Sequence, residues 1–206
     1  MKAEPISHYI GKLHDRGIKA ATLLGKGPTL DFHTPFAGEY VMGVNNVSPR
    51  KRCDAVVFSD SKLDRWSFDP AADLIRTAES KESHEGRGYY FERGARPGSP
   101  YNPAAIPRDL RLGSGTKALA ILALAGVEHV TLWGFDGGVP QLGGLGYAKC
   151  LGDDELIGTP GKHAVEYGPN LLHVCYQPWS AIRLLEHGTA RGTITLWEDL
   201  CQPPLG

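Results

Sequence analysis

The sequence lacks long apolar runs, paired cysteines and an excess of charge of either sign. No segment approaches the roughly 18 apolar residues that cross a bilayer, and no signal peptide opens the chain. The four cysteines form no CxxC pair and no Cys/His cluster at zinc spacing, so we expect reduced thiols in a cytoplasmic protein. A net charge of −1 argues against a polyanion-binding protein overall, although it leaves room for a local basic patch.

The residues that are present suit one globular domain with many turns. The 206 residues are 41% hydrophobic and 9% aromatic, which supplies the core of a single domain over residues 1–206. Glycine and proline, 26 and 15 residues, make up about a fifth of the chain against roughly 12% on average. Surplus glycine is typical of sharp turns and of backbone that approaches a ligand. Glycine-rich segments occur at 25–29, 111–115, 133–138 and 141–146.

Apolar segments of strand and helix type alternate along the chain. The pattern predicts strands at 18–24, 39–46, 53–60, 127–136 and 192–199, and helices at 5–16, 69–80, 113–126 and 178–188. In the helix at 69–80, Asp69 is expected to cap the first turn and Pro70 to occupy it. The alternation predicts a Rossmann-like α/β domain, with a mostly parallel sheet flanked by helices.

Residues 81–112 interrupt this alternation with five arginines, four aromatic residues and several glycines and prolines. A compact domain rarely spends some thirty residues without regular structure, so we expect a basic-aromatic lid or binding loop. Together with the run Arg50-Lys51-Arg52, the segment has the composition that contacts nucleic-acid phosphates and stacks on bases. A solvated loop is the alternative.

The predicted strands end in polar and glycine residues, and parallel sheets bind ligands beyond those ends. We therefore predict a nucleotide- or phosphate-binding crevice lined by Gly25, Lys26, Gly27, Pro28, Thr29, Asn45, Asn46, Ser59, Asp60, Gly134, Phe135 and Asp136. The predicted helix start at Ser114 and Gly115 favours an anion through its free N–H groups and dipole, and Arg111 stands beside it. A serine N-cap with a solvated arginine is the alternative. Asp136 belongs to no DxD pair, so no metal site is predicted.

These segments, in this order, resemble the bacterial sialyltransferases of glycosyltransferase family 42 and the related DUF115-type proteins. The family's GNGPSL loop corresponds to GKGPTL at 25–30, and its nucleotide-contacting Asn to Asn45. Its pattern R-x-x-S-G, followed by an apolar helix and a strand ending in S-G-I-D, runs without a gap from Arg111 to Asp136. Its histidine eight residues before an A-L-x-x-L-E helix corresponds to His173.

The resemblance implies a GT-A-like domain that transfers a sugar from a CMP-sugar-type donor to an acceptor hydroxyl, with inversion. It implies no obligatory metal or other cofactor. It makes His173 the general base, places Tyr147 near the leaving phosphate, and assigns that phosphate to Arg111 and Ser114. The family's membrane-associating tail is missing, so we expect no membrane partner. The expected acceptor is a soluble glycan or a hydroxymethylated base in DNA.

Two other functions fit the same residues. One is a DUF115-type diphosphokinase that uses ATP and Mg²⁺, and Lys26, which stands where the family has Asn, also leaves a diphosphate donor open. The other is a nucleotide-binding module without catalysis.

Overall fold

The structure is a computed structural model that describes residues 4–48, 50–58, 68–76, 88–90, 113–136, 150, 170–185 and 194. Of the predicted lid at 81–112, only residues 88–90 belong to this part.

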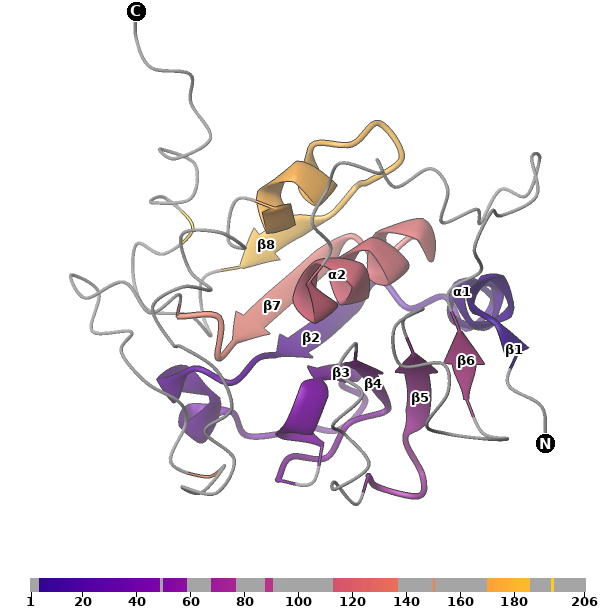
Figure 1. The fold of residues 1–206 in the computed structure, drawn as a ribbon. Helices are drawn as coiled ribbons and strands as arrows, with labels where there is room; N and C mark the ends of the chain where they lie inside the picture. The colour runs from indigo at the N-terminus through magenta and orange to yellow at the C-terminus, as the bar shows by residue number, and fades with distance from the viewer. Residues whose placement is uncertain are drawn as a thin grey trace, which may run out of the picture.

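The described strands form one sheet in which every neighbouring pair is parallel. They are β1 (Glu4–Pro5), β2 (Ala20–Leu24), β3 (Val41–Val44), β4 (Ala55–Phe58), β5 (Asp73–Arg76), β6 (Tyr89–Tyr90), β7 (His129–Trp133) and β8 (Arg183–Leu185). Across the sheet they follow the order β1-β6-β5-β4-β3-β2-β7-β8 (Figure 1). The parallel sheet confirms the predicted α/β class and is consistent with a Rossmann-like fold.

The order of the strands reverses at β2. This strand pairs with β3 on one side and with β7 on the other, so the chain leaves β2 in one direction and later returns to its opposite edge. The carboxyl ends of β2 and β7 therefore form the switch point, where open parallel sheets bind their ligands.

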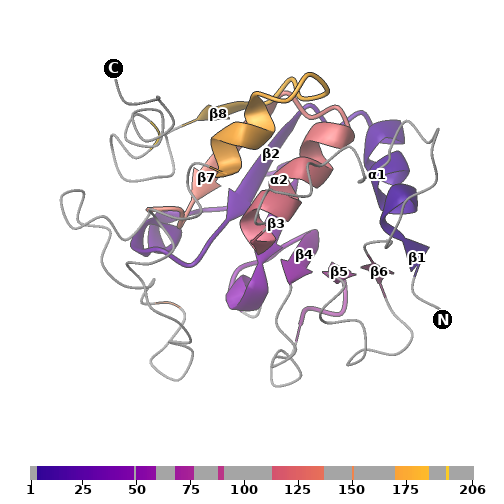
Figure 2. The same ribbon diagram turned by 45° about the horizontal axis from the view of Figure 1, so that its top comes forward.

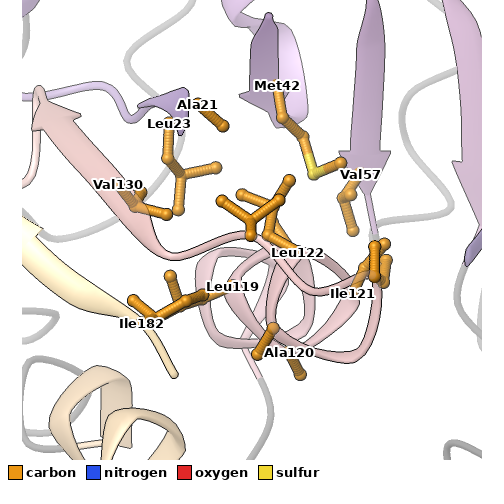
Figure 3. Close-up of a cluster of buried hydrophobic side chains, with 14 of the residues drawn as sticks. Ala21, Leu23, Met42, Val57, Leu119, Ala120, Ile121, Leu122, Val130 and Ile182 are labelled. Atoms are coloured by element: carbon orange, nitrogen blue, oxygen red, sulfur yellow. The ribbon is translucent and has the colours of Figure 1, made fainter. Parts of the chain in front are cut away.

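Helices α1 (Ile6–Asp15) and α2 (Ser114–Leu124) and a helical segment at 170–175 lie side by side on one face of the sheet (Figure 2). All three contribute to the larger core cluster. Figure 3 shows Leu122 of α2 pointing toward Leu23 and Met42 of the sheet. No helix in the described ranges is long and apolar enough to cross a bilayer.

The other face of the sheet carries a smaller core cluster formed by Leu24, Leu30, Val41, Val56 and Phe58, among others. Here the described connections are the short 3-10 helices η1 (Pro28–Phe32) and η2 (Asn45–Val47), at the carboxyl ends of β2 and β3 (Figure 1). The segment at 25–30, predicted as a turn, thus continues into η1.

The helix predicted at 69–80 is wrong, because residues 73–76 form strand β5 instead. Asp69 shapes a turn rather than capping a helix: its Oδ1 accepts the N–H of Ala71 at 2.8 Å. The neighbours Leu74 and Ile75 then face opposite core clusters. Adjacent apolar residues buried on both faces are typical of a parallel strand.

The helix predicted at 178–188 is also wrong, since residues 183–185 form β8 and pair with β7. A helical segment that the pattern did not predict precedes it at 170–175, and Pro178 follows that segment. Of the strand predicted at 192–199, the structure describes Ile194, which is helical and buried. Short apolar runs fit both the helical and the strand periodicity, and pairing with a neighbouring strand decides which structure forms.

Cys53, Cys150 and Cys175 are free thiols that we expect to react slowly in the folded protein. Burial raises the pKa of Cys53 and of Cys175 to about 12. Burial, together with Asp31, raises the pKa of Cys150 to about 11. At pH 8, therefore, about one in a thousand or fewer of these thiols is the reactive thiolate. Alkylation with iodoacetamide at pH 8, followed by peptide mass spectrometry, should label them at least tenfold faster in guanidinium than in buffer. Equal rates would contradict this expectation.

Candidate functional site

The switch point is built from two loops whose backbones bond to each other. The N–H of Gly25 donates to the carbonyl of Trp133 at 2.6 Å, and the N–H of Gly27 donates to that of Gly134 at 2.7 Å. Gly134 has a left-handed φ of 73°. A Cβ on Gly25 would lie 2.5 Å from the carbonyl oxygen of Gly134. Glycine is therefore needed for this close approach, and these N–H groups are used within the protein.

Thr29 and Asp136 complete the junction. The hydroxyl oxygen of Thr29 accepts the N–H of Gly134 at 2.8 Å. The N–H of Thr29 donates to Oδ2 of Asp136 at 2.9 Å. Asp136 is 1% exposed, so its carboxylate fastens the first turn of η1 to the loop after β7 rather than facing solvent.

The start of α2 adjoins the end of β3. Gly113 is the N-cap of α2, and the hydroxyl of Ser114 donates to Oδ1 of Asn45 at 3.1 Å. Asn45 has a left-handed φ of 54°, which is uncommon for a residue with a side chain. Asn46 beside it is buried in η2. The alternative expectation of a serine N-cap is therefore wrong, because Ser114 binds a strand end instead. The first N–H groups of α2 stand next to this contact.

Phe135 connects the loop junction to the start of α2. A Cβ on Gly25 would lie 3.0 Å from Cδ2 of its ring, and a Cβ on Gly115 would lie 2.8 Å from Cε1. The ring therefore packs against both glycines. The ends of β2, β3 and β7 and the start of α2, all predicted to line one crevice, meet around these contacts.

No protein-family model, curated protein or solved structure matches the chain.

Of the remaining predicted site residues, the structure describes Lys26, Pro28 and His173. Ser59, Asp60, Arg111 and Tyr147 lie outside the described residues. Lys26 and Pro28 are half-buried within the loop after β2. His173 is exposed on the segment 170–175, between the buried Leu172 and Val174, and its carbonyl accepts Nε2 of Gln177 at 3.1 Å.

A buried polar cluster on the second face was missed by the sequence analysis. Oε1 of Glu39 accepts the hydroxyl of Thr22 and lies 3.2 Å from Nε2 of His33. Its Oε2 accepts the N–H of Phe36 at 3.3 Å. The side chains of His33 and Glu39 are 2% and 4% exposed. The sequence offers one signal, an acid directly before the apolar strand at 40–44, but nothing that pairs it with Thr22 of β2.

This cluster fastens the connection between β2 and β3 to the sheet. The ring of His33 lies 5.8 Å from that of Trp133, centroid to centroid, and Nζ of Lys51 donates to the carbonyl of His33 at 3.0 Å. The described residues hold no group of three or more His, Cys, Asp or Glu side chains arranged for a metal ion.

Proposed function

We propose that the protein is a cytoplasmic glycosyltransferase that moves a sugar from a nucleotide-activated donor to an acceptor hydroxyl, with inversion and no obligatory metal. The observation that carries the proposal is the hydrogen bond between Ser114 and Asn45, which joins the start of α2 to the end of β3 beside the switch point. Nucleotides bind open parallel sheets at this position. The resemblance of GKGPTL and of residues 111–136 to glycosyltransferase family 42 supports the same function and a GT-A-like fold.

In this proposal the nucleotide lies along the start of α2. The N–H groups of Ser114 and Gly115 and the helix dipole hold the phosphate, and Arg111 adds a charge-assisted hydrogen bond. Oδ1 of Asn45 is used by Ser114, so its Nδ2 is the group offered to the ribose or base. The half-buried ring of Phe135, which packs against Gly25 and Gly115, forms the bottom of the proposed site.

The transfer then needs one base and one stabilised leaving group. Nε2 or Nδ1 of His173 takes the proton of the acceptor hydroxyl, and the oxygen forms a bond to the anomeric carbon. The bond from that carbon to the phosphate oxygen breaks, and the phosphate leaves with the electron pair. The charge that develops there is held by the start of α2 and Arg111, with Tyr147 beside it.

A thermal-shift screen with CMP, UDP, GDP, ADP and ATP tests the nucleotide site. The best ligand should raise the melting temperature of the wild type. Asn45→Gly, which keeps the left-handed backbone but removes the amide, should bind that ligand roughly 5–10-fold more weakly, the effect of one lost hydrogen bond. A screen without any shift would count against the whole proposal.

The assignment of the base is tested in a transfer assay with a donor that carries the nucleotide found in the screen. His173→Ala should lower transfer at least about 100-fold while nucleotide affinity stays unchanged. His8→Ala, which removes another exposed histidine, from α1, serves as the matched control. Transfer that survives in His173→Ala refutes the assigned base.

Turnover assays on the ligands that bind in this screen separate the alternatives. Lys26, a cation within the glycine loop, favours a diphosphate ligand, and ATP- and Mg²⁺-dependent turnover would identify a DUF115-type diphosphokinase. Binding without turnover across a panel of donors would identify a nucleotide-binding module. The acceptor in our proposal is a soluble glycan or a hydroxymethylated base in DNA.

A further inference from the structure

Two phenylalanines project from the connection between β2 and β3. Phe32 is 74% exposed and Phe36 is 68% exposed, the two largest exposures among the large hydrophobic side chains that the structure describes. Rings of this size usually contribute to a core or an interface. Two of them close together on one connection are typical of a contact surface.

The backbone that presents these rings is anchored to the sheet. His33 lies between them in sequence and points the other way, toward the buried carboxylate of Glu39. Glu39 in turn binds the hydroxyl of Thr22 on β2 and the N–H of Phe36. The backbone that carries the exposed rings is therefore anchored before any partner arrives, which lowers the entropy cost of binding.

A basic loop adjoins the aromatic one. Arg50 and Arg52 are exposed in the connection between β3 and β4, and Lys51 between them donates to the carbonyl of His33 at 3.0 Å. Because β2, β3 and β4 are neighbours in the sheet, their connections leave it side by side (Figure 1). The hydrogen bond from Lys51 to His33 thus joins the connection that carries the phenylalanines to the one that carries the arginines.

Three acids on or beside these connections accept hydrogen bonds from within the protein. Asp31 accepts the N–H of Cys150 at 2.9 Å, Asp54 accepts the N–H of Val41 at 2.8 Å, and Glu39 is buried. Residues 32–38 contain no Asp, Glu, Lys or Arg. The described residues of the two connections thus include exposed arginines and exposed phenylalanines.

We infer that Phe32, Phe36, Arg50 and Arg52 form a docking surface for single-stranded nucleic acid. Unpaired bases offer flat faces that stack on phenylalanine rings, and their phosphates attract arginine. A base pair in a duplex hides those faces, so the rings favour a single strand. That this strand carries the acceptor base rests on the proposed function, whereas the binding itself does not.

Fluorescence anisotropy with a labelled 16-nucleotide oligothymidine tests the surface. The wild type should bind at 50 mM NaCl and lose affinity steeply by 300 mM. The double variant F32A/F36A should bind at least about tenfold more weakly. R50Q/R52Q should lower the slope of log K against log salt by roughly one to two. Phe36→Tyr, which keeps the aromatic face, should retain binding.

Matched controls come from other surfaces. Tyr176 is 61% exposed next to the segment 170–175, and Arg183 is exposed on β8, so Tyr176→Ala and Arg183→Gln should bind like the wild type. No binding at 50 mM NaCl, equal losses in the controls, or equal affinity for a duplex of the same length would overturn the inference. So would sedimentation that shows a dimer lost in F32A/F36A without any oligonucleotide bound, because a second copy would then cover the rings.

This test is independent of the nucleotide screen. Asn45→Gly should bind the oligonucleotide normally even where it binds the nucleotide weakly. A positive anisotropy result with a failed nucleotide screen refutes the proposed function and keeps the surface, and the reverse result keeps the function and removes the surface.

Discussion

Gly134→Ala should lower the free energy of unfolding by roughly 2–6 kcal/mol. At a φ of 73° an alanine pays the cost of a left-handed backbone. Its Cβ would also collide with the carbonyl oxygen of Gly25, lie 2.6 Å from the carbonyl carbon and lie 3.1 Å from the nitrogen of Gly27. These are backbone atoms held by hydrogen bonds, so they cannot move aside as a flexible side chain can.

Gly38→Ala separates the two costs. Gly38 has a similar φ of 82°, but a Cβ there would meet nothing within 4 Å. It should therefore lose only about 1–2 kcal/mol, the left-handed cost alone. Urea denaturation followed by circular dichroism measures both variants. Equal losses in the two variants would show that the junction of the loops after β2 and β7 is not as tight as the structure has it.

Glu39→Ala should destabilise the fold by roughly 3–5 kcal/mol, because it leaves buried polar partners without their acceptor. The hydroxyl of Thr22 and Nε2 of His33 both lose Oε1, and the N–H of Phe36 loses Oε2. Thr22 and His33 are 3% and 4% exposed, so their polar atoms depend on partners within the protein rather than on bulk solvent.

The control for Glu39 is an acid that forms an ion pair at the surface. Glu128 lies 2.8 Å from Nζ of Lys19, and both side chains are largely solvated. Glu128→Ala should leave the denaturation midpoint nearly unchanged, because exposed pairs contribute little. If Glu39→Ala behaved like Glu128→Ala, the polar cluster would contribute nothing to holding the connection between β2 and β3.

Local patterns predict the elements whose signals do not depend on a partner. The helical spacing at 5–16 and the apolar helix that starts near Ser114 give α1 and α2, and the apolar runs at 18–24 and 127–136 give β2 and β7. The predictions for the segments around Leu74 and Leu184 fail because two adjacent apolar residues fit both a helix and a strand. Their conformation is fixed by β4 and β7, which lie beside them in space.

The candidate site is likewise predictable from the sequence only in part. Glycine content predicts tight turns at 25–29 and 133–138, and parallel topology predicts that they share an edge. The partner of each N–H is not predictable, because the contact between Gly25 and Gly134 depends on the register of β2 against β7. The contact between His33 and Glu39 is not predictable from the sequence for a related reason, because the third member of the cluster, Thr22, comes from a different element.

The bonded loops after β2 and β7 also determine how selection between ligands would work. The ladder between the two strands continues through Gly25, Gly27 and Gly134, so the edge of the sheet ends in a stiff rim rather than in two independent arms. Loops that are bonded to each other in this way cannot close around a bound ligand. A ligand at this edge would have to match its shape on arrival, and discrimination would come from misfit rather than from adjustment.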